Sequence, residues 1–130
     1  MVVHGAVDQA VRGLRSSGRT ISFQDAFHDY ARVKGFLNQH GVTEGQSVGV
    51  VGVLGTYWAR MGRFRIEARI PNREEFLRVE PEERAKAVKA LARTGMKALV
   101  AKGAVFAVLS NERWQQVPGT HNYFVLFPPG

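Results

Sequence analysis

Apolar residues that recur every three or four positions predict three helices. The first covers residues 3–16 and ends at the "SSG" of residues 16–18. The second starts behind Ser22, an N-cap residue with Asp25 three positions later, and ends at Gly41. Its apolar stripe, typical of a surface that faces a core, consists of Phe23, Phe27, Tyr30, Val33 and Leu37.

The third predicted helix runs from Pro81 to Arg93. Proline suits its first turn, and the acidic residues near its start and the basic residues near its end match the helix dipole. Gly95 then ends the segment. Before this helix, a break at Pro71 and Asn72 followed by "NREEF" predicts a short helical turn. We expect the inward face of the third helix to consist of Ala85, Val88, Leu91 and Ala92.

Three other runs have the composition of strands. "SVGVVGVL", residues 47–54, is almost wholly apolar, which predicts a central strand buried on both faces. "FRIEARI", residues 64–70, alternates apolar and charged positions, so we expect one wet face or a place near an edge. "MKALVA", residues 96–101, predicts another buried strand. "AVFAVL", residues 104–109, fits either a helical turn or a continuation of that strand.

The C-terminal stretch "RWQQVPGTHNYFVLF" predicts two short strands joined by a turn at Pro118, Gly119 and Thr120. Helices that alternate with apolar strands favour an α/β fold. We therefore expect a three-layer Rossmann-like sheet of about four or five strands, mostly parallel, with a C-terminal antiparallel hairpin. Residues 1–130 are expected to form a single α/β domain, with residues 1–18 as a peripheral helix.

Composition narrows the possible chemistry. The 130 residues include no cysteine, which excludes disulfides, thiolate zinc sites and cysteine nucleophiles. No apolar run approaches the ~20 residues that span a bilayer. The net charge of +7 is spread along the chain rather than gathered in one polybasic run. This charge suits attraction to phosphates or anionic lipid headgroups, although a solvated basic surface is the simpler interpretation.

Three glycines near the first strand raise the question of a nucleotide site. Gly49, Gly52 and Gly55 are spaced G-x-x-G-x-x-G, unlike the G-x-G-x-x-G of dinucleotide folds, and no G-K-[ST] follows. We expect Gly49 and Gly52 inside the strand, where they allow close packing, and Gly55 at the end of the strand. We predict no cofactor. Open α/β sheets bind ligands at the carboxyl ends of central strands, so the candidate ligand-binding residues are Gly55, Thr56, Tyr57, Trp58 and Arg60.

The sequence contains no recognisable catalytic or metal-binding set. Its four histidines are scattered, without an H-E-x-x-H pair, and no G-x-S-x-G elbow is present. His28, Asp29 and Tyr30 place a base, an acid and a phenol side by side, but neighbours on a helix point in different directions, so a solvated helix surface is favoured. The glutamates gather near helix starts, where the helix dipole accounts for them.

Nucleic-acid binding is an alternative. Arg63, Arg65 and Arg69 form a candidate basic surface. Together with Arg60 and the neighbouring aromatic residues, they would supply the phosphate contacts and stacking that bind single strands. No known nucleic-acid module accompanies them, and an inward-facing Trp58 is the simpler interpretation.

Three segments, "GVTEGQSVGVVGVLGTYWARMGRFRIEARIP", "EERAKAVKALARTGMKALVA" and "WQQVPGTHNYFVLF", together resemble the soluble C-terminal domain of some bacterial polytopic membrane proteins of the dolichyl-phosphate-mannose-type glycosyltransferase class. The resemblance covers residues 41–127 and departs at Gln46, Phe124 and Leu126. It implies an extracytoplasmic accessory domain and carries no catalytic residue. Residues 21–52 are also similar to the opening of adenylate-forming acyl-activating enzymes, as a shared helix, turn and strand.

The residues and the resemblance together favour a non-enzymatic accessory or binding domain, a soluble part or relative of a bacterial membrane protein. The expected partners are a membrane protein, a membrane surface or a small anionic ligand. A free-standing α/β protein that binds a nucleotide or nucleic acid is the second hypothesis, and a small hydrolase or transferase is the third. The resemblance implies a location on the extracytoplasmic face of the bacterial membrane, and without it we expect a cytoplasmic one.

Overall fold

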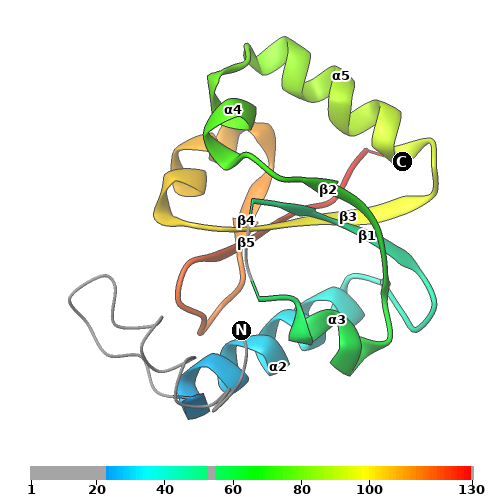
Figure 1. Ribbon diagram of the computed structural model, residues 1–130, viewed down its shortest axis with the longest axis vertical. Coiled ribbons are helices and arrows are strands. Elements are labelled where there is room, and N and C mark those ends of the chain that lie inside the picture. The colour runs from blue at the N-terminus through cyan, green and yellow to red at the C-terminus, as the bar shows by residue number, and fades with distance from the viewer. Residues whose placement is uncertain (1–22, 53–54, 130) are drawn as a thin grey trace.

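The computed structural model describes residues 23–52 and 55–129, and these form a five-stranded mixed sheet (Figure 1). The strands are β1 (Ser47–Val51), β2 (Arg65–Ile70), β3 (Met96–Lys102), β4 (Trp114–Gln116) and β5 (Tyr123–Leu126). β1 pairs in parallel with both β2 and β3, whereas β5 is antiparallel to β3 and to β4. The order across the sheet is β2-β1-β3-β5-β4. The predicted α/β fold, with a parallel core and a C-terminal antiparallel hairpin, is confirmed.

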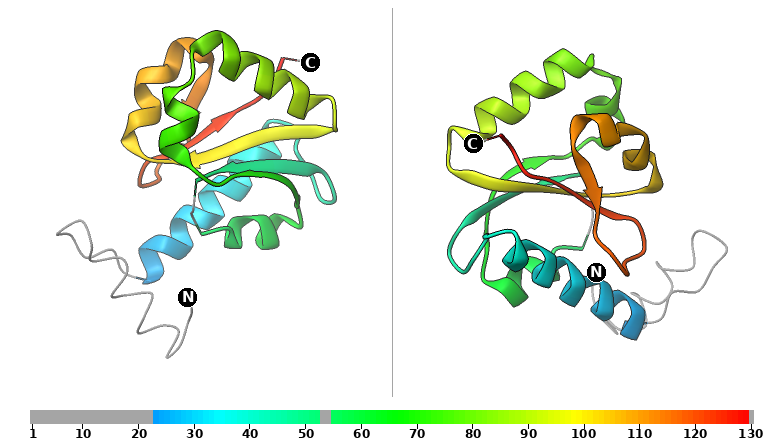
Figure 2. Two further views of the ribbon diagram at one scale, coloured as in Figure 1. Left: turned by 45° about the horizontal axis from the view of Figure 1, so that its top comes forward. Right: turned by 180° about the vertical axis from the view of Figure 1, so that it is seen from behind.

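Helices lie against both faces of the sheet (Figures 1 and 2). α2 (Phe23–Gln39) and α3 (Tyr57–Gly62) cover one face, where Val33 and Trp58 belong to a buried apolar cluster. The other face carries α4 (Arg73–Arg78), α5 (Pro81–Ala92) and the 3-10 helix η1 (Ala104–Glu112), where Val88 and Trp114 belong to a second cluster. Within the described ranges, no helix has the length and apolar character needed to cross a membrane.

Some predictions about the helices lie outside the described residues. These are the helix over residues 3–16 and the cap at Ser22. The apolar stripe of α2 is confirmed at Val33 and Leu37, which are fully buried, but Phe27 is exposed. The sequence left residues 104–109 open between a helical turn and a continued strand. They are helical, because η1 covers them.

β1 is an inner strand, as its valines predict, and all five of its residues are buried. A Cβ added to Gly49 would lie 2.6 Å from Met96 Sδ and 2.7 Å from Leu99 Cδ1, so this glycine allows the close packing that was predicted. The prediction for Gly52 is wrong, because this residue follows the strand. Its φ of 81° is a left-handed conformation that glycine adopts without strain, and its N–H donates to Ile70 O at 2.7 Å.

β2 and α5 follow their predicted patterns with one exception. β2 is an edge strand whose charged residues are exposed and whose apolar residues are half-buried. α5 begins at Pro81, carries Glu82 and Glu83 in its first turn, and buries Val88. Its predicted inward face is wrong at Ala85, which is exposed, because the neighbouring Arg84 is buried instead.

The chain order creates a topological switch point between β1 and β3. β1 leads through α3 to β2 on one side, and the crossover through α4 and α5 then returns past β1 to β3 on the other side. In open α/β sheets, the carboxyl ends of strands at such a point form the usual ligand crevice. A ligand site is therefore expected at this edge of the sheet.

Candidate functional site

A guanidinium lies at the switch point, beside the ends of β1 and β3. Arg73, the first residue of α4, donates from Nη1 to the backbone oxygen of Lys102 at 3.0 Å. A Cβ added to Gly103 would lie 2.7 Å from Arg73 Nη1, and one added to Gly52 would lie 3.3 Å from Arg73 Cβ. Arg73 Nη2 also lies 3.3 Å from Glu74 Oε2. The switch point therefore holds a cation that already has partners.

The residues predicted to bind a ligand follow β1 and lie at the start of α3, but they divide between core and surface. Trp58 is fully buried and its Nε1 donates to Gly55 O at 2.9 Å, which fixes the loop before α3. A Cβ added to Gly55 would overlap the Tyr30 hydroxyl. Tyr57 is 47% exposed and packs beside Tyr30, with 6.0 Å between ring centroids. Thr56 is half-buried at the start of α3, and Arg60 is exposed.

The prediction that "HDY" forms a solvated helix surface is wrong for Asp29. This side chain is 3% exposed, and its Oδ2 accepts the backbone N–H of His121 at 3.1 Å and lies 2.8 Å from His121 Nδ1. Asp29 Oδ1 is buried and has no hydrogen-bond partner in the described part of the chain. His28, in contrast, is exposed and accepts from Arg32 Nε at 3.2 Å. The three neighbours therefore point in different directions, as predicted.

Two phenols adjoin the Asp29 carboxylate. Burial, with smaller contributions from Tyr30 and Asp29, raises the pKa of the Tyr123 phenol above its ordinary value. Burial and then Asp29 likewise raise the pKa of Tyr30. Lys102 Nζ lies 5.2 Å from the centroid of the Tyr123 ring. The Thr120 hydroxyl donates to Val117 O at 2.7 Å and accepts the backbone N–H of Tyr123 at 3.3 Å, so it is part of the turn between β4 and β5.

The predicted basic surface carries carboxylates among its arginines. Arg63 Nη1 lies 3.7 Å from Glu44 Oε2, and Arg65 Nε lies 3.3 Å from Glu67 Oε1. Arg69 is exposed on the same edge strand as Arg65. Exposed pairs of this kind contribute little to stability, but they lower the net positive charge that a ligand would meet.

Three adjoining hollows surround the C-terminal segment at the amino end of β3, opposite the switch point. The first, of about 490 Å³, lies between α5, the end of η1 and the start of β4, over the apolar side chains Phe76, Val88, Trp114 and Leu126. The other two have volumes of about 440 and 340 Å³. Lys89, Lys97 and Arg113 each line two of the three. We call these hollows together the α5 groove.

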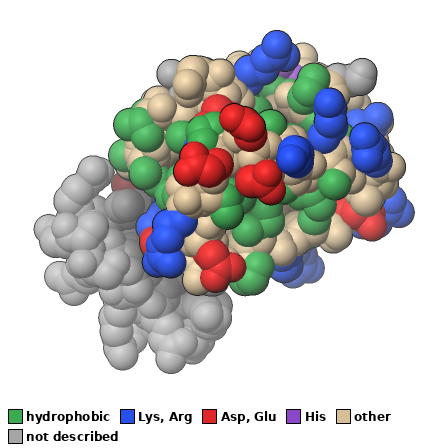
Figure 3. Space-filling model, turned by 90° about the horizontal axis from the view of Figure 1, so that it is seen from above, with side chains coloured by type: hydrophobic (Ala, Val, Ile, Leu, Met, Phe, Trp, Pro, Cys, Tyr) green, Lys and Arg blue, Asp and Glu red, His purple; other side chains and the backbone are tan. Residues whose placement is uncertain are grey.

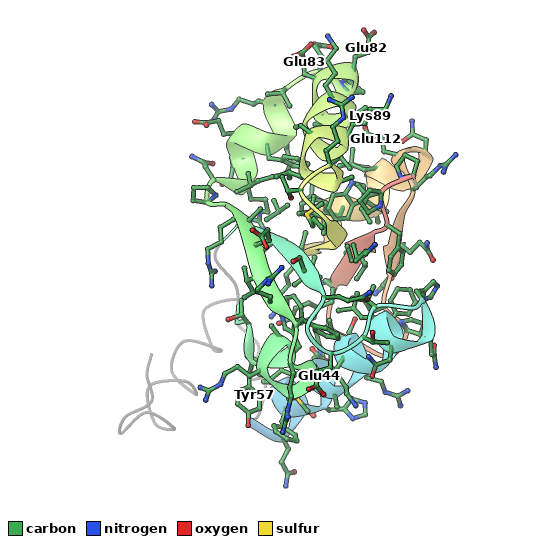
Figure 4. All side chains as sticks on the ribbon, turned by 90° about the vertical axis from the view of Figure 1, so that its right-hand side faces the viewer. Glu44, Tyr57, Glu82, Glu83, Lys89 and Glu112 are labelled. Atoms are coloured by element: carbon green, nitrogen blue, oxygen red, sulfur yellow. The ribbon has the colours of Figure 1, made fainter. Side chains whose placement is uncertain are left out.

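Basic side chains form the rim of the α5 groove. Lys89, Arg93, Lys97 and Arg113 are all exposed, and none makes an ion pair with any residue that the structure describes. Figure 3 looks down on α4 and α5, with red acidic side chains in the middle and blue basic side chains toward one end. In Figure 4, Lys89 and Glu112 lie at one end of the molecule and Tyr57 at the other.

One wall of the α5 groove is held by a buried ion pair. Arg84 donates from Nε and Nη2 to the two carboxylate oxygens of Glu112, at 3.0 and 2.8 Å, and from Nη1 to Leu77 O and Val79 O. The hydrogen bond with Glu112 raises the pKa of Arg84, although burial opposes this effect. The ion pair therefore fixes η1 to α5, and the Nη1 bonds fix α5 to the end of α4 and to the α4–α5 connection.

Sequence reasoning missed the α5 groove, although part of its signal is present. Lys86, Lys89, Arg93 and Lys97 are spaced three and four residues apart, which places basic residues along one side of α5 and beyond its end. Arg113, Trp114 and Leu126 come from segments distant from α5 in sequence, so only the fold reveals them. Among the described residues, no group of three or more His, Asp or Glu side chains could hold a metal ion.

Comparisons with known proteins do not identify this chain. No family model matches it, and no curated protein or solved structure matches it significantly. The resemblance to the soluble domains of bacterial membrane glycosyltransferases therefore stays a prediction.

Proposed function

We propose that this chain is a non-enzymatic binding domain that takes an anionic ligand or partner through the α5 groove. The observation that carries this proposal is a rim of four cations, Lys89, Arg93, Lys97 and Arg113, which make no ion pair with any described residue and surround an apolar floor. Concave, mostly apolar sites with a few convergent polar groups are typical ligand sites, and clefts lined by one sign of charge concentrate ligands of the opposite sign.

More specifically, we propose that the chain is an accessory domain, a soluble part or relative of a bacterial membrane protein. The order of motifs over residues 41–127 supports it. Helices on both faces of the mixed sheet support a three-layer Rossmann-like description. The partner would be the membrane protein itself, a membrane surface or a small anionic ligand.

The test uses the aromatic anion 8-anilinonaphthalene-1-sulfonate and its uncharged analogue N-phenyl-1-naphthylamine. We expect the anion to bind more tightly and its affinity to fall with added salt. Changing Lys89 and Arg113 together to glutamine should lower that affinity about fivefold, because each exposed charge pair contributes about 0.5 kcal/mol. The control changes Arg60 and Arg78 to glutamine, which alters the net charge equally. Equal losses in the two double variants would contradict the proposal.

A nucleotide or nucleic-acid binder is the second candidate, and the exposure of Tyr57 beside Arg60 is the observation that favours it. Tyr57 is able to stack on a base, whereas Trp58 is fully buried. Anisotropy of a labelled single-stranded oligonucleotide at low salt tests this alternative. Binding that is lost with Tyr57→Ala but kept with Lys89→Gln would favour it over the α5 groove.

A further inference from the structure

The α5 groove is longer than a small ligand requires. Its first hollow extends from Pro81 to Lys89, and another continues from Lys89 past Arg93 to Lys97. α5 has 12 residues, which corresponds to a length of about 18 Å. An extended peptide rises about 3.3 Å per residue, so roughly five or six residues would span the groove.

Its charges also lie on both walls. Lys89 lies on α5 and Arg93 caps the end of this helix one turn later, whereas Arg113 lies on the opposite wall, directly before β4. Successive side chains of an extended peptide point to alternate sides, so acidic residues would reach both walls. Between the walls, the floor at Val88 and Trp114 is apolar and nearly closed to water. A bulky apolar side chain would fill it.

We infer that the α5 groove binds an extended acidic segment of a partner protein, with one bulky apolar side chain over Val88 and Trp114 and carboxylates toward Lys89 and Arg113. This inference rests on the proposed function. A flat membrane surface would meet only the raised cations, because the apolar floor lies below them. Charge complementarity and the concave apolar floor therefore favour a peptide over a bilayer.

Two alanines on α5 provide a matched pair of variants. Ala85 is exposed and lines the first hollow, whereas Ala87 is exposed on the same helix but lines none of the three. Ala85→Glu places a carboxylate inside the groove, and Ala87→Glu makes the same charge change outside it. Both replace alanine with another good helix former, so the helix itself tolerates either change.

The experiment selects displayed random hexapeptides on the full chain, with counter-selection on the Ala85→Glu variant. We expect enrichment of peptides that combine several Asp or Glu residues with one Leu, Phe or Trp. Fluorescence anisotropy of an enriched peptide should then show at least a tenfold loss of affinity for Ala85→Glu and less than a threefold loss for Ala87→Glu. Replacing the apolar residue of the peptide with serine should cost at least tenfold.

Three results would overturn the inference. One is the absence of acidic peptides from the selection, and another is equal affinity of the enriched peptide for the two alanine variants. The third is a chain that binds no peptide but binds vesicles with half anionic phospholipid, or a single-stranded oligonucleotide, and loses this binding in the Ala85→Glu variant. If 8-anilinonaphthalene-1-sulfonate still binds at Lys89 and Arg113 in such a case, the proposed function stands and only the inference of a peptide ligand is refuted. If this probe does not bind there either, the proposed function and the peptide inference are both refuted.

Discussion

Arg84 offers the sharpest test of how the α5 groove is held together. Its side chain is 6% exposed, and its guanidinium makes four hydrogen bonds that join α5, η1 and the α4–α5 connection. The substitution Arg84→Met keeps an unbranched apolar chain of similar length but removes all four bonds. We expect a large loss of folding stability, because Glu112 then keeps its charge without a partner.

The size of this loss follows from the burial of the pair. Breaking a buried ion pair on one side costs about 3–5 kcal/mol. The Glu112 side chain is 21% exposed, so water rehydrates its carboxylate in part and the expected loss is about 3 kcal/mol. For 130 residues this corresponds to a fall in Tm of roughly 10 °C. The double variant with Arg84→Met and Glu112→Met should be more stable than Arg84→Met alone, since no charge remains unpaired.

Urea unfolding followed by tryptophan fluorescence measures these free energies. Lys86→Met is the matched control, because Lys86 pairs with Glu83 at 3.3 Å on an exposed surface. It should change the free energy of unfolding by less than about 0.5 kcal/mol. A loss below about 1 kcal/mol for Arg84→Met, or a double variant less stable than the single one, would refute the reasoning.

Three further predictions concern packing and pH. Gly49→Ala should destabilise the fold by about 1–3 kcal/mol in urea unfolding, because the added Cβ would meet two core side chains. Gly35→Ala in α2 should instead stabilise the fold by about 0.5–1 kcal/mol, because the added Cβ would meet no atom within 4 Å. Gly55→Ala should destabilise the fold through the Tyr30 hydroxyl, and a double-mutant cycle with Tyr30→Phe should recover part of the loss. Because burial raises the pKa of Tyr123 above its ordinary value of 10, the stability that this phenol contributes is complete below pH 10 and is lost as pH rises toward the folded-state pKa. Tyr123→Phe should therefore show a shallower loss of stability above pH 10, and its phenolate absorbance should lack the step at highest pH.

The fold was predictable to the extent that local patterns decide it. The valine run of β1, the alternation of β2 and the proline at the start of α5 each predict an element that the structure confirms. Predictions failed where the sequence pattern does not show a backbone turn or a long-range contact. Gly52 continues the apolar run in sequence, but its φ of 81° turns the backbone out of the strand, directly after its N–H has bonded to Ile70 O. Ala85 fits the apolar stripe of α5, but the pairing of Arg84 with Glu112 directs Arg84 toward the interior and leaves Ala85 exposed.

The candidate site was less predictable, because side chains distant in sequence assemble it. Tyr57 and Arg60 lie at the surface beside the carboxyl end of β1, and a role for them in binding stays a prediction. The contact between Asp29 and His121 joins residues 92 positions apart, and no spacing in the sequence indicates it. The α5 groove similarly unites α5 with β4 and the C-terminal segment. Periodicity alone therefore indicates only its helical wall.

The most direct test of the central claim is a map of backbone amide chemical shifts during titration with 8-anilinonaphthalene-1-sulfonate. The proposed function predicts that the shifts concentrate between Lys86 and Lys97, at Arg113 and Trp114, and near Phe127, around the α5 groove. Shifts confined to the segment from Gly52 to Arg60 at the carboxyl end of β1 would contradict it and return the binding site to the switch point of the sheet.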